Sequence, residues 1–360
     1  MPETRMLTAA QAIFEATAIA LESDPAVFVM GEGALDPKGI FGTTAGLWQR
    51  YGRERVLEMP ISEAAFTGIA IGAALLGQRP LVIHQRVEFC LLAMEQLVNN
   101  AAKLHYVSDG RHRVPLVVRL IVGRGWGQGP AHSQSLEAMF AQVPGLKVVM
   151  PSSAADAKGL LLGAIADDGP VIFIEHRWVH YVRGHVPAGS TPLPLDGPRC
   201  IRPGRDLTLV TTSYMTLEAL QAADALAREG CEVELIDLRL LSPLRPSAIY
   251  ESVRRTGKLL CVDTGFQNLG IGAEVTARVS EACFARLEAA PVRMGLPEHP
   301  TPSSRALAAE YYPRSPDLAR AAGKLAGLSE KTVARVCETL VSKREDLPLD
   351  VPHPAFQGPF

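Results

Sequence analysis

The chain has 360 residues, of which 47% are hydrophobic and 21% are charged, and its formal net charge is -2. This length is enough for two or three domains, and the nearly neutral balance gives no electrostatic footprint for nucleic acid or a membrane surface. Its six cysteines have no paired spacing, which argues against a disulfide scaffold or a zinc site and favours a reducing, cytoplasmic location. No apolar run reaches the length of a membrane span without a charge, glycine or proline.

The first half of the chain alternates short apolar strands with segments of helical periodicity. The predicted strands are Ala26–Met30, Arg55–Met59, Pro80–His84, Val114–Val122, Lys147–Met150 and Val171–Glu175. The predicted helices are Leu7–Leu21, Ala64–Gly77 with Glu63 at its start, Leu91–Val107, His132–Gln142 and Ala154–Asp167. This alternation, with apolar strands, indicates a mostly parallel sheet covered by helices on both faces.

The second half begins after a proline-rich stretch, Val186–Arg205, which has no periodicity and is predicted to be a linker. The strands predicted beyond it are Leu207–Thr211, Glu232–Asp237, Leu259–Val262 and Val292–Gly295. The predicted helices are Leu217–Glu229, Pro246–Thr256 and Gly270–Phe284, followed by a helical region at Asp317–Leu340. We therefore expect an α/β fold of two doubly wound domains: residues 1–185, a linker at 186–205, a smaller C-terminal domain at 206–340 and a proline-rich tail at 341–360.

Glu63 is the most informative polar residue. It precedes an almost wholly apolar run, residues 64–77, whose alanines and glycines allow another backbone or a ligand to approach closely. Ser62 is a good N-cap, which places Glu63 in the first helical turn. The helix dipole there favours a carboxylate, whereas burial favours its neutral form. The alternative to a functional carboxylate is a capping residue beside an exposed helix end.

A second candidate region is the loop after strand Val114–Val122, which has glycines at 123, 125, 127 and 129. Open parallel sheets bind ligands at the carboxyl ends of their strands, where this loop begins. His132, at the predicted start of the next helix, is a candidate acid–base group, although it could instead cap that helix or bond the loop backbone. The charged residues Arg86 and Glu88, which precede Phe89 after strand Pro80–His84, are weaker candidates for a pocket.

Motifs that would hold a phosphate are missing. The chain has no Walker P-loop and no Gly-x-Gly-x-x-Gly between a strand and a helix. It also has no Gly-Asp-Gly segment, although Ser108-Asp109-Gly110 and Asp168-Gly169 come close. If the chain uses a phosphorylated cofactor, we expect another polypeptide to hold the phosphates.

These features together resemble the beta subunit of thiamine-diphosphate-dependent 2-oxoacid dehydrogenases of the pyruvate, branched-chain and acetoin types. The resemblance covers residues 7–300 and implies a pyrimidine-binding transketolase-like domain followed by a transketolase-type C-terminal domain. The motifs that carry it are Gly31-Glu32, Gly46-Leu47, Pro60-Ile61-Ser62-Glu63, Gly68–Gly77 with Arg79-Pro80, Asn99–Lys103, Ala131–Ser135, Pro144–Val149, Asp156–Leu160, Ile236–Arg239 and Gly270–Glu274.

The resemblance implies roles for individual residues. Glu63 would hydrogen-bond N1′ of the cofactor's aminopyrimidine and so favour the imino tautomer, whose nitrogen removes the C2 proton of the thiazolium. Phe89 would pack on the aminopyrimidine, and Glu32 would be a further cofactor-binding residue. His132 would face the substrate and stabilise the intermediate or guide acyl transfer to a lipoyl group.

The resemblance also implies partners and ions. In this family the alpha subunit carries the Gly-Asp-Gly segment and its Mg²⁺, so the chain would be active only within an α2β2 heterotetramer. A lipoyl acyltransferase would be a further partner. Backbone carbonyls that correspond to a structural K⁺ site in some relatives belong to Leu116, Ala164, Ile165, Asp167 and Gly169.

The stretch before Phe89 departs from the family's usual aromatic-rich pattern. His84 and Arg86 add hydrogen-bond donors and positive charge there, so we expect His84, Arg86, Glu88 and His132 to line the substrate pocket. From this we predict a substrate more polar or anionic than pyruvate, such as a sugar-like or phosphorylated ketone. Two alternatives to the dehydrogenase stay open: a split transketolase-like carboligase that needs no lipoamide, and a non-catalytic interaction subunit.

Overall fold

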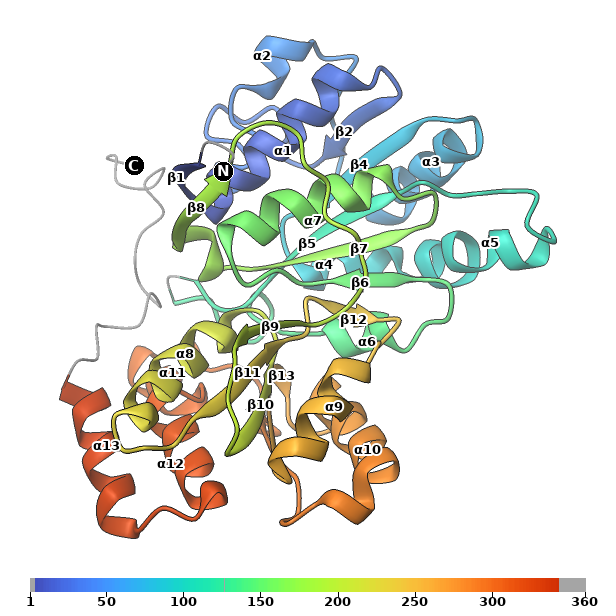
Figure 1. The fold of residues 1–360 in the computed structure, drawn as a ribbon. Coiled ribbons are helices and arrows are strands. Elements are labelled where there is room, and N and C mark those ends of the chain that lie inside the picture. The colour runs from blue at the N-terminus through green and yellow to red at the C-terminus, as the bar shows by residue number, and fades with distance from the viewer. Residues whose placement is uncertain (1–3, 126, 343–360) are drawn as a thin grey trace.

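The computed structural model describes residues 4–125 and 127–342, which form two α/β domains with the first half of the chain above the second (Figure 1). The predicted tail lies outside the described residues except for positions 341 and 342, which end the last helix.

The first domain is built on a seven-stranded sheet with the order β12-β6-β7-β5-β4-β2-β3. Its strands are β2 (Val27–Gly31), β3 (Val56–Glu58), β4 (Arg79–His84), β5 (Val117–Val122), β6 (Lys147–Val149), β7 (Val171–His176) and β12 (Leu240–Ser242). Every neighbouring pair is parallel except β12 with β6. The central strands β5 and β7 are buried along their whole length, as expected for a sheet covered on both faces.

Helices cover both faces of this sheet. One face carries α1 (Ala9–Ser23) and α7 (Ala154–Ala166), which pack against each other through small residues. The other face carries α3 (Glu63–Leu75) and the helical run formed by α4 (Val87–Cys90), the 3-10 turn Leu91–Ala93, the π-helical segment Gln96–Ala101 and α5 (Ala102–Val107). Short helices α2 (Leu47–Tyr51) and α6 (Glu137–Ala141) complete the domain.

The second domain is built on a five-stranded sheet with the order β14-β13-β10-β11-β9. Its strands are β9 (Arg199–Arg202), β10 (Leu207–Thr211), β11 (Val233–Asp237), β13 (Leu259–Phe266) and β14 (Val292–Leu296). Helices α8 (Tyr214–Ala227) and α12 (Ser315–Ala326) cover one face, and α9 (Ser247–Thr256) and α10 (Ile271–Cys283) cover the other. Helix α13 (Glu330–Ser342) packs against α12 and α8 at the end of the domain, and α11 (Arg305–Tyr311) precedes α12 in the chain (Figure 1).

The predicted two-domain architecture is confirmed, with corrections in three places. The helix predicted from His132 is wrong over its first turn, because α6 begins only at Glu137. The predicted linker is wrong in part, since β9 lies within it and β8 (Arg183–Pro187) enters it and pairs with β1 (Thr4–Thr8). The short strand β12 was not predicted; it leaves the second half of the chain to extend the first domain's sheet.

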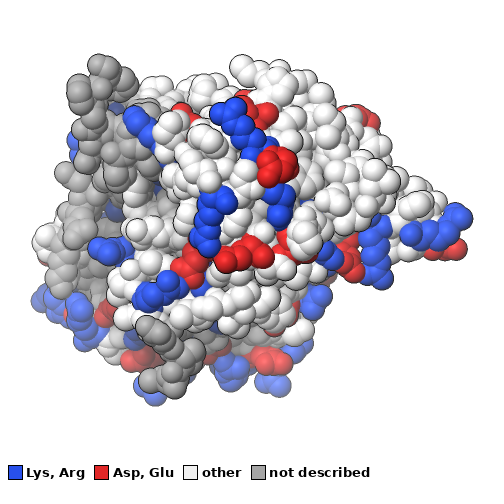
Figure 2. Space-filling model, turned by 90° about the horizontal axis from the view of Figure 1, so that it is seen from above, with Lys and Arg blue, Asp and Glu red and all other residues white. Residues whose placement is uncertain are grey.

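The surface carries charges of both signs side by side. Figure 2, which views the molecule from above, shows blue and red side chains next to one another, with uncharged areas between them. None of the helices in the described parts of the chain combines the length and apolar character that crossing a bilayer requires.

Candidate functional site

The candidate residues converge because of where the parallel strands end. Glu32 directly follows β2, α4 follows β4, and the loop at 123–136 follows β5. The carboxyl ends of parallel strands lie at one edge of the sheet, which is where open α/β sheets bind ligands. Glu63, at the start of α3, follows β3 at the same edge.

Glu63 combines burial with the lack of an internal partner. The residue is 6% exposed, and Ser62 makes no side-chain capping bond to the helix that Glu63 begins. Across residues 4–125 and 127–342, no hydrogen bond or ion pair to the Glu63 carboxylate is formed. The two carboxylate oxygens are not among the fully buried, unsatisfied atoms of the described residues, so they reach the small opening that this exposure leaves. A partner from outside the chain can bond them there.

Glu32 is an electrostatic neighbour of Glu63. Burial and then the charges of Glu63 and Glu58 raise the pKa of Glu32. One of its carboxylate oxygens, Oε1, is buried without a hydrogen bond to any described residue. Glu58, in contrast, is occupied, because it accepts hydrogen bonds from the backbone N–H groups of Gly33 and Leu35 at 2.6 and 2.9 Å.

Phe89 and His132 form the aromatic part of the site. Their rings meet edge to face with centroids 5.5 Å apart, although one lies on α4 and the other on the glycine-rich loop. His132 is exposed, and its backbone N–H donates to the carbonyl of Gly129 at 3.1 Å, so it belongs to the loop and not to a helix. The structure therefore brings these two predicted site residues together.

His84 differs from its prediction. It is 2% exposed, stacks on Phe66 with ring centroids 5.1 Å apart, and lies 3.4 Å from the hydroxyl of Thr67. Burial lowers the pKa of His84 to about 3, so the imidazole is neutral at physiological pH. The positive charge expected from His84 is therefore absent, and its place in a substrate pocket stays a prediction.

The side chains of Arg86 and Glu88 also point into the protein, toward the glycine-rich loop. Arg86 is 2% exposed and donates to the carbonyl of Gly123 at 2.7 Å. Glu88 accepts from the backbone N–H of Gln134 at 2.7 Å. Both side chains bond the glycine-rich loop, and a direct contact of either with substrate stays a prediction.

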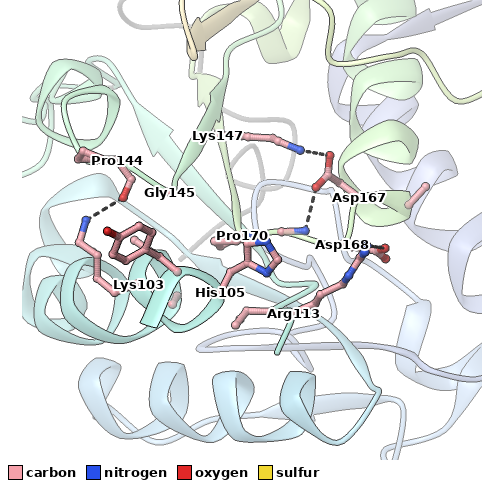
Figure 3. A pocket seen from close by; sticks show the side chains of 15 residues that line it. Lys103, His105, Arg113, Pro144, Gly145, Lys147, Asp167, Asp168 and Pro170 are labelled. Atoms are coloured by element: carbon pink, nitrogen blue, oxygen red, sulfur yellow. Dashed lines mark hydrogen bonds and ion pairs between the residues drawn. The ribbon is translucent and has the colours of Figure 1, made fainter. Parts of the chain in front are cut away.

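The carbonyls proposed for K⁺ lie at the opposite edge of the sheet, where a cavity of about 940 Å³ opens (Figure 3). Arg79 donates to the carbonyls of Ile165 and Asp167 at 3.0 and 3.1 Å. The Leu116 and Ala164 carbonyls accept backbone N–H groups. The Arg79 guanidinium thus bonds two of the five carbonyls, and a K⁺ site at these residues stays a prediction.

Two further basic side chains line the cavity in Figure 3, and both are paired with carboxylates. Lys147 bonds the carboxylate of Asp167, and Arg113 bonds that of Asp168. In the described part of the chain, no three His, Cys, Asp or Glu side chains are placed to hold a metal ion.

Comparison with known proteins identifies the family to which this chain belongs. Residues 5–179 match the pyrimidine-binding domain of transketolase, and residues 199–318 match the transketolase C-terminal domain. The chain is 40% identical to the beta subunit of acetoin:2,6-dichlorophenolindophenol oxidoreductase from Cupriavidus necator, covering 89% of this chain and 97% of that protein. The chain belongs to the family of dehydrogenase E1 beta subunits.

Other E1 beta subunits are equally similar. The 2-oxoisovalerate dehydrogenase subunit beta of Bacillus subtilis is 40% identical, over 84% of this chain and 93% of that one. Pyruvate dehydrogenase E1 component subunit beta-1 of Arabidopsis thaliana is 41% identical, over 84% of each chain. A solved structure titled as a split-gene transketolase in an inactive beta4 tetramer has a TM-score of 0.72 at 22% identity, covers 89% of this chain and 99% of its own, and supports the fold.

The site fits the thiamine diphosphate on which E1 enzymes depend. The carboxylate of the little-exposed Glu63 has no donor among the described residues, and a buried Glu32 oxygen is unpartnered, so both can meet the polar edge of an aminopyrimidine. Phe89 supplies an aromatic face nearby. The predicted membership of this family is thus confirmed, whereas the roles of single residues stay predictions.

One residue near this site, Phe41, could not be identified from the sequence. Phe41 lies below the guanidinium groups of Arg86 and Arg177, with 5.4 and 4.5 Å from each Cζ to the ring centroid. It comes from an irregular stretch between β2 and α2, where no periodicity points to burial.

Proposed function

We propose that this chain is the catalytic beta subunit of a thiamine-diphosphate-dependent dehydrogenase that decarboxylates a 2-oxoacid and passes the acyl group to a lipoyl carrier. The observation that carries the proposal is the little-exposed Glu63, whose carboxylate has no partner among the described residues, in a chain of this family. The enzyme would be an oxidoreductase, as the names of its relatives describe them.

Glu63 has the environment that a proton-sharing carboxylate needs. When bound, thiamine diphosphate supplies the electron sink for cleaving the bond next to a carbonyl. Glu63 would hold a proton between its carboxylate and N1′ of the aminopyrimidine, and the low exposure of the residue would strengthen that hydrogen bond once the cofactor covers it. Phe89 would orient the ring, and the exposed His132 would face the substrate.

We propose an alpha subunit as the obligatory partner, in an α2β2 assembly. The chain has no Gly-Asp-Gly segment, so the partner would hold the cofactor's diphosphate and its Mg²⁺. Around α3, large apolar side chains are exposed, among them Ile61 at 86% and Leu76 at 85%. Ile61 lies beside Glu63 and Leu76 at the other end of α3, so exposed apolar residues along this helix support a subunit interface that reaches the cofactor.

The substrate proposed is a 2-oxoacid, because two of the relatives are named for pyruvate and 2-oxoisovalerate dehydrogenases. The earlier expectation of a more anionic substrate is not carried forward, since Arg86 is bonded to the loop and His84 is neutral. A cytoplasmic location is proposed on the six free cysteines.

Co-expression with the alpha subunit tests the proposal. The purified complex is assayed with pyruvate, 3-methyl-2-oxobutanoate, acetoin and ketose phosphates, with and without lipoamide. We expect release of CO₂ from a 2-oxoacid and acylation of lipoamide. Transfer of carbon units from ketose phosphates without lipoamide would establish the carboligase alternative, and failure of every donor with a correctly assembled complex would establish the non-catalytic one.

A further inference from the structure

The loop that carries His132 is bonded by side chains from the start of α4, the short helix that carries Phe89. Arg86 is the N-cap residue of α4, two positions after the end of β4, and Glu88 lies within α4. Their side chains bond the loop close to its two ends, at Gly123 and Gln134. His132 lies between these attachment points.

Arg86 fixes the first half of the loop. Besides its 2.7 Å bond to the Gly123 carbonyl, it donates through Nη2 to the side-chain amide oxygen of Gln128. The Phe41 ring lies 5.4 Å from its Cζ. A guanidinium donates in several fixed directions at once, which a lysine ammonium at this place could not reproduce.

Glu88 fixes the second half. Its Oε1 accepts the backbone N–H of Gln134 at 2.7 Å, two positions after His132. The buried hydroxyl of Ser133 donates to the carbonyl of Gln128 at 3.0 Å and so joins the two halves. Gly123 N–H and the carbonyl of Gln134 close the base of the loop at 3.4 Å.

The positive charge of Arg86 is enclosed by the protein and is not available to a substrate. Burial, and then the nearby Arg177, lower the pKa of Arg86 to about 10, so Arg86 stays cationic at neutral pH. Its bonds go to neutral oxygens of the loop. A buried guanidinium that loses such acceptors is costly, which ties the loop conformation to Arg86.

We propose that Arg86 and Glu88 are positioning residues that clamp the described loop residues, 123–125 and 127–134, and so hold the His132 imidazole against Phe89. They would act on the reaction through the loop and not by contact with substrate. The kinetic part of this inference rests on the proposed function, whereas the structural part does not.

Hydrogen exchange of the full chain tests the structural part, with and without the alpha subunit. We expect Glu88→Ala and Arg86→Met to speed exchange of loop amides, that of Gln134 by about tenfold, the factor that corresponds to one lost hydrogen bond. Glu88→Gln retains an acceptor oxygen and should restore most of the protection. Glu22→Ala, which removes a partner of Arg50 at the surface, is the control and should leave the loop unchanged. Unchanged loop exchange in both clamp variants would overturn the proposal.

Kinetics of the assembled enzyme test the consequence. A clamp predicts that Arg86→Met and Arg86→Lys both lower kcat by about tenfold or more with little change in KM, because the substrate loses no contact. If instead Arg86→Met raised KM for the oxoacid while Arg86→Lys preserved it, Arg86 would be a substrate ligand and the clamp would be wrong. Failure of every variant and of the wild type to turn over would count against the proposed function, and the exchange result would still decide the clamp.

Discussion

Single residues decide the shape of the loop at the site. Gly123 has φ +85°, and a Cβ there would lie 2.7 Å from Nε2 of the buried His176. Gly127 has a similar φ of +77°, but no atom lies within 4 Å of its Cβ position. The two glycines therefore share the backbone strain that a side chain would bring and differ in the space around them.

This pair gives a matched prediction at the residue scale. Gly127→Ala should lower the free energy of unfolding by about 1–2 kcal/mol, the cost of a left-handed conformation for an L-residue. Gly123→Ala should cost about 1–3 kcal/mol more, because His176 must move in a close-packed core. Urea unfolding of both variants measures the difference, and equal costs would show that the Gly123 site can relax.

At the scale of elements, the strands and helices of the sheet core were predictable because their periodicity is unambiguous. β5 and β7 read as apolar runs, and α3 and α7 as apolar helices bounded by Ser62 and Ser153. The elements that escaped prediction depend on tertiary partners. Strands β1, β8, β9 and β12 are short, and each forms only by pairing with a strand distant in sequence.

The candidate site, too, has residues whose positions the sequence predicts and residues whose positions it does not. Glu63 begins α3, Phe89 lies on α4 shortly after β4, and His132 lies in the loop after β5, so the strand pattern locates all three at one edge of the sheet. Whether a loop side chain points outward or inward depends on its three-dimensional neighbours. Arg86 was expected to face a substrate, yet its hydrogen bonds go to a loop more than thirty residues away, and no local pattern reveals such bonds.

For the whole molecule, the contact between the two domains includes a buried pair of carboxyl groups. Glu137 comes from α6 of the first domain and Asp263 from β13 of the second. Burial, and next the charge of Asp263, raise the pKa of Glu137 to about 8, and burial also raises the pKa of Asp263. Thr264 donates to Glu137 at 3.1 Å, so the pair holds a proton at neutral pH within a hydrogen-bonded setting.

This pair predicts a specific pH dependence. The folded state keeps a proton that the unfolded state releases near its ordinary pKa of 4.5, so this pair's contribution to stability falls as pH rises from about 4.5 to about 8. Glu137→Gln carries a neutral group at every pH and should remove this contribution. From about pH 6 to about pH 8, the wild type should lose about 2 kcal/mol more than Glu137→Gln in urea unfolding. Parallel pH profiles for the two proteins would refute a shared proton.

The most direct test of the account concerns Glu63 in the assembled enzyme. Glu63→Gln keeps the shape of the side chain and removes its ability to share a proton, so assembly and the unfolding temperature should be unchanged. The measurement is the rate at which the C2 proton of bound thiamine diphosphate exchanges with deuterated solvent, read by NMR after acid quenching. We predict exchange at least about a hundredfold slower in Glu63→Gln than in the wild-type complex. Exchange at the wild-type rate, in a variant that still binds the cofactor, would contradict the role of Glu63 and with it the proposed catalytic function of this chain.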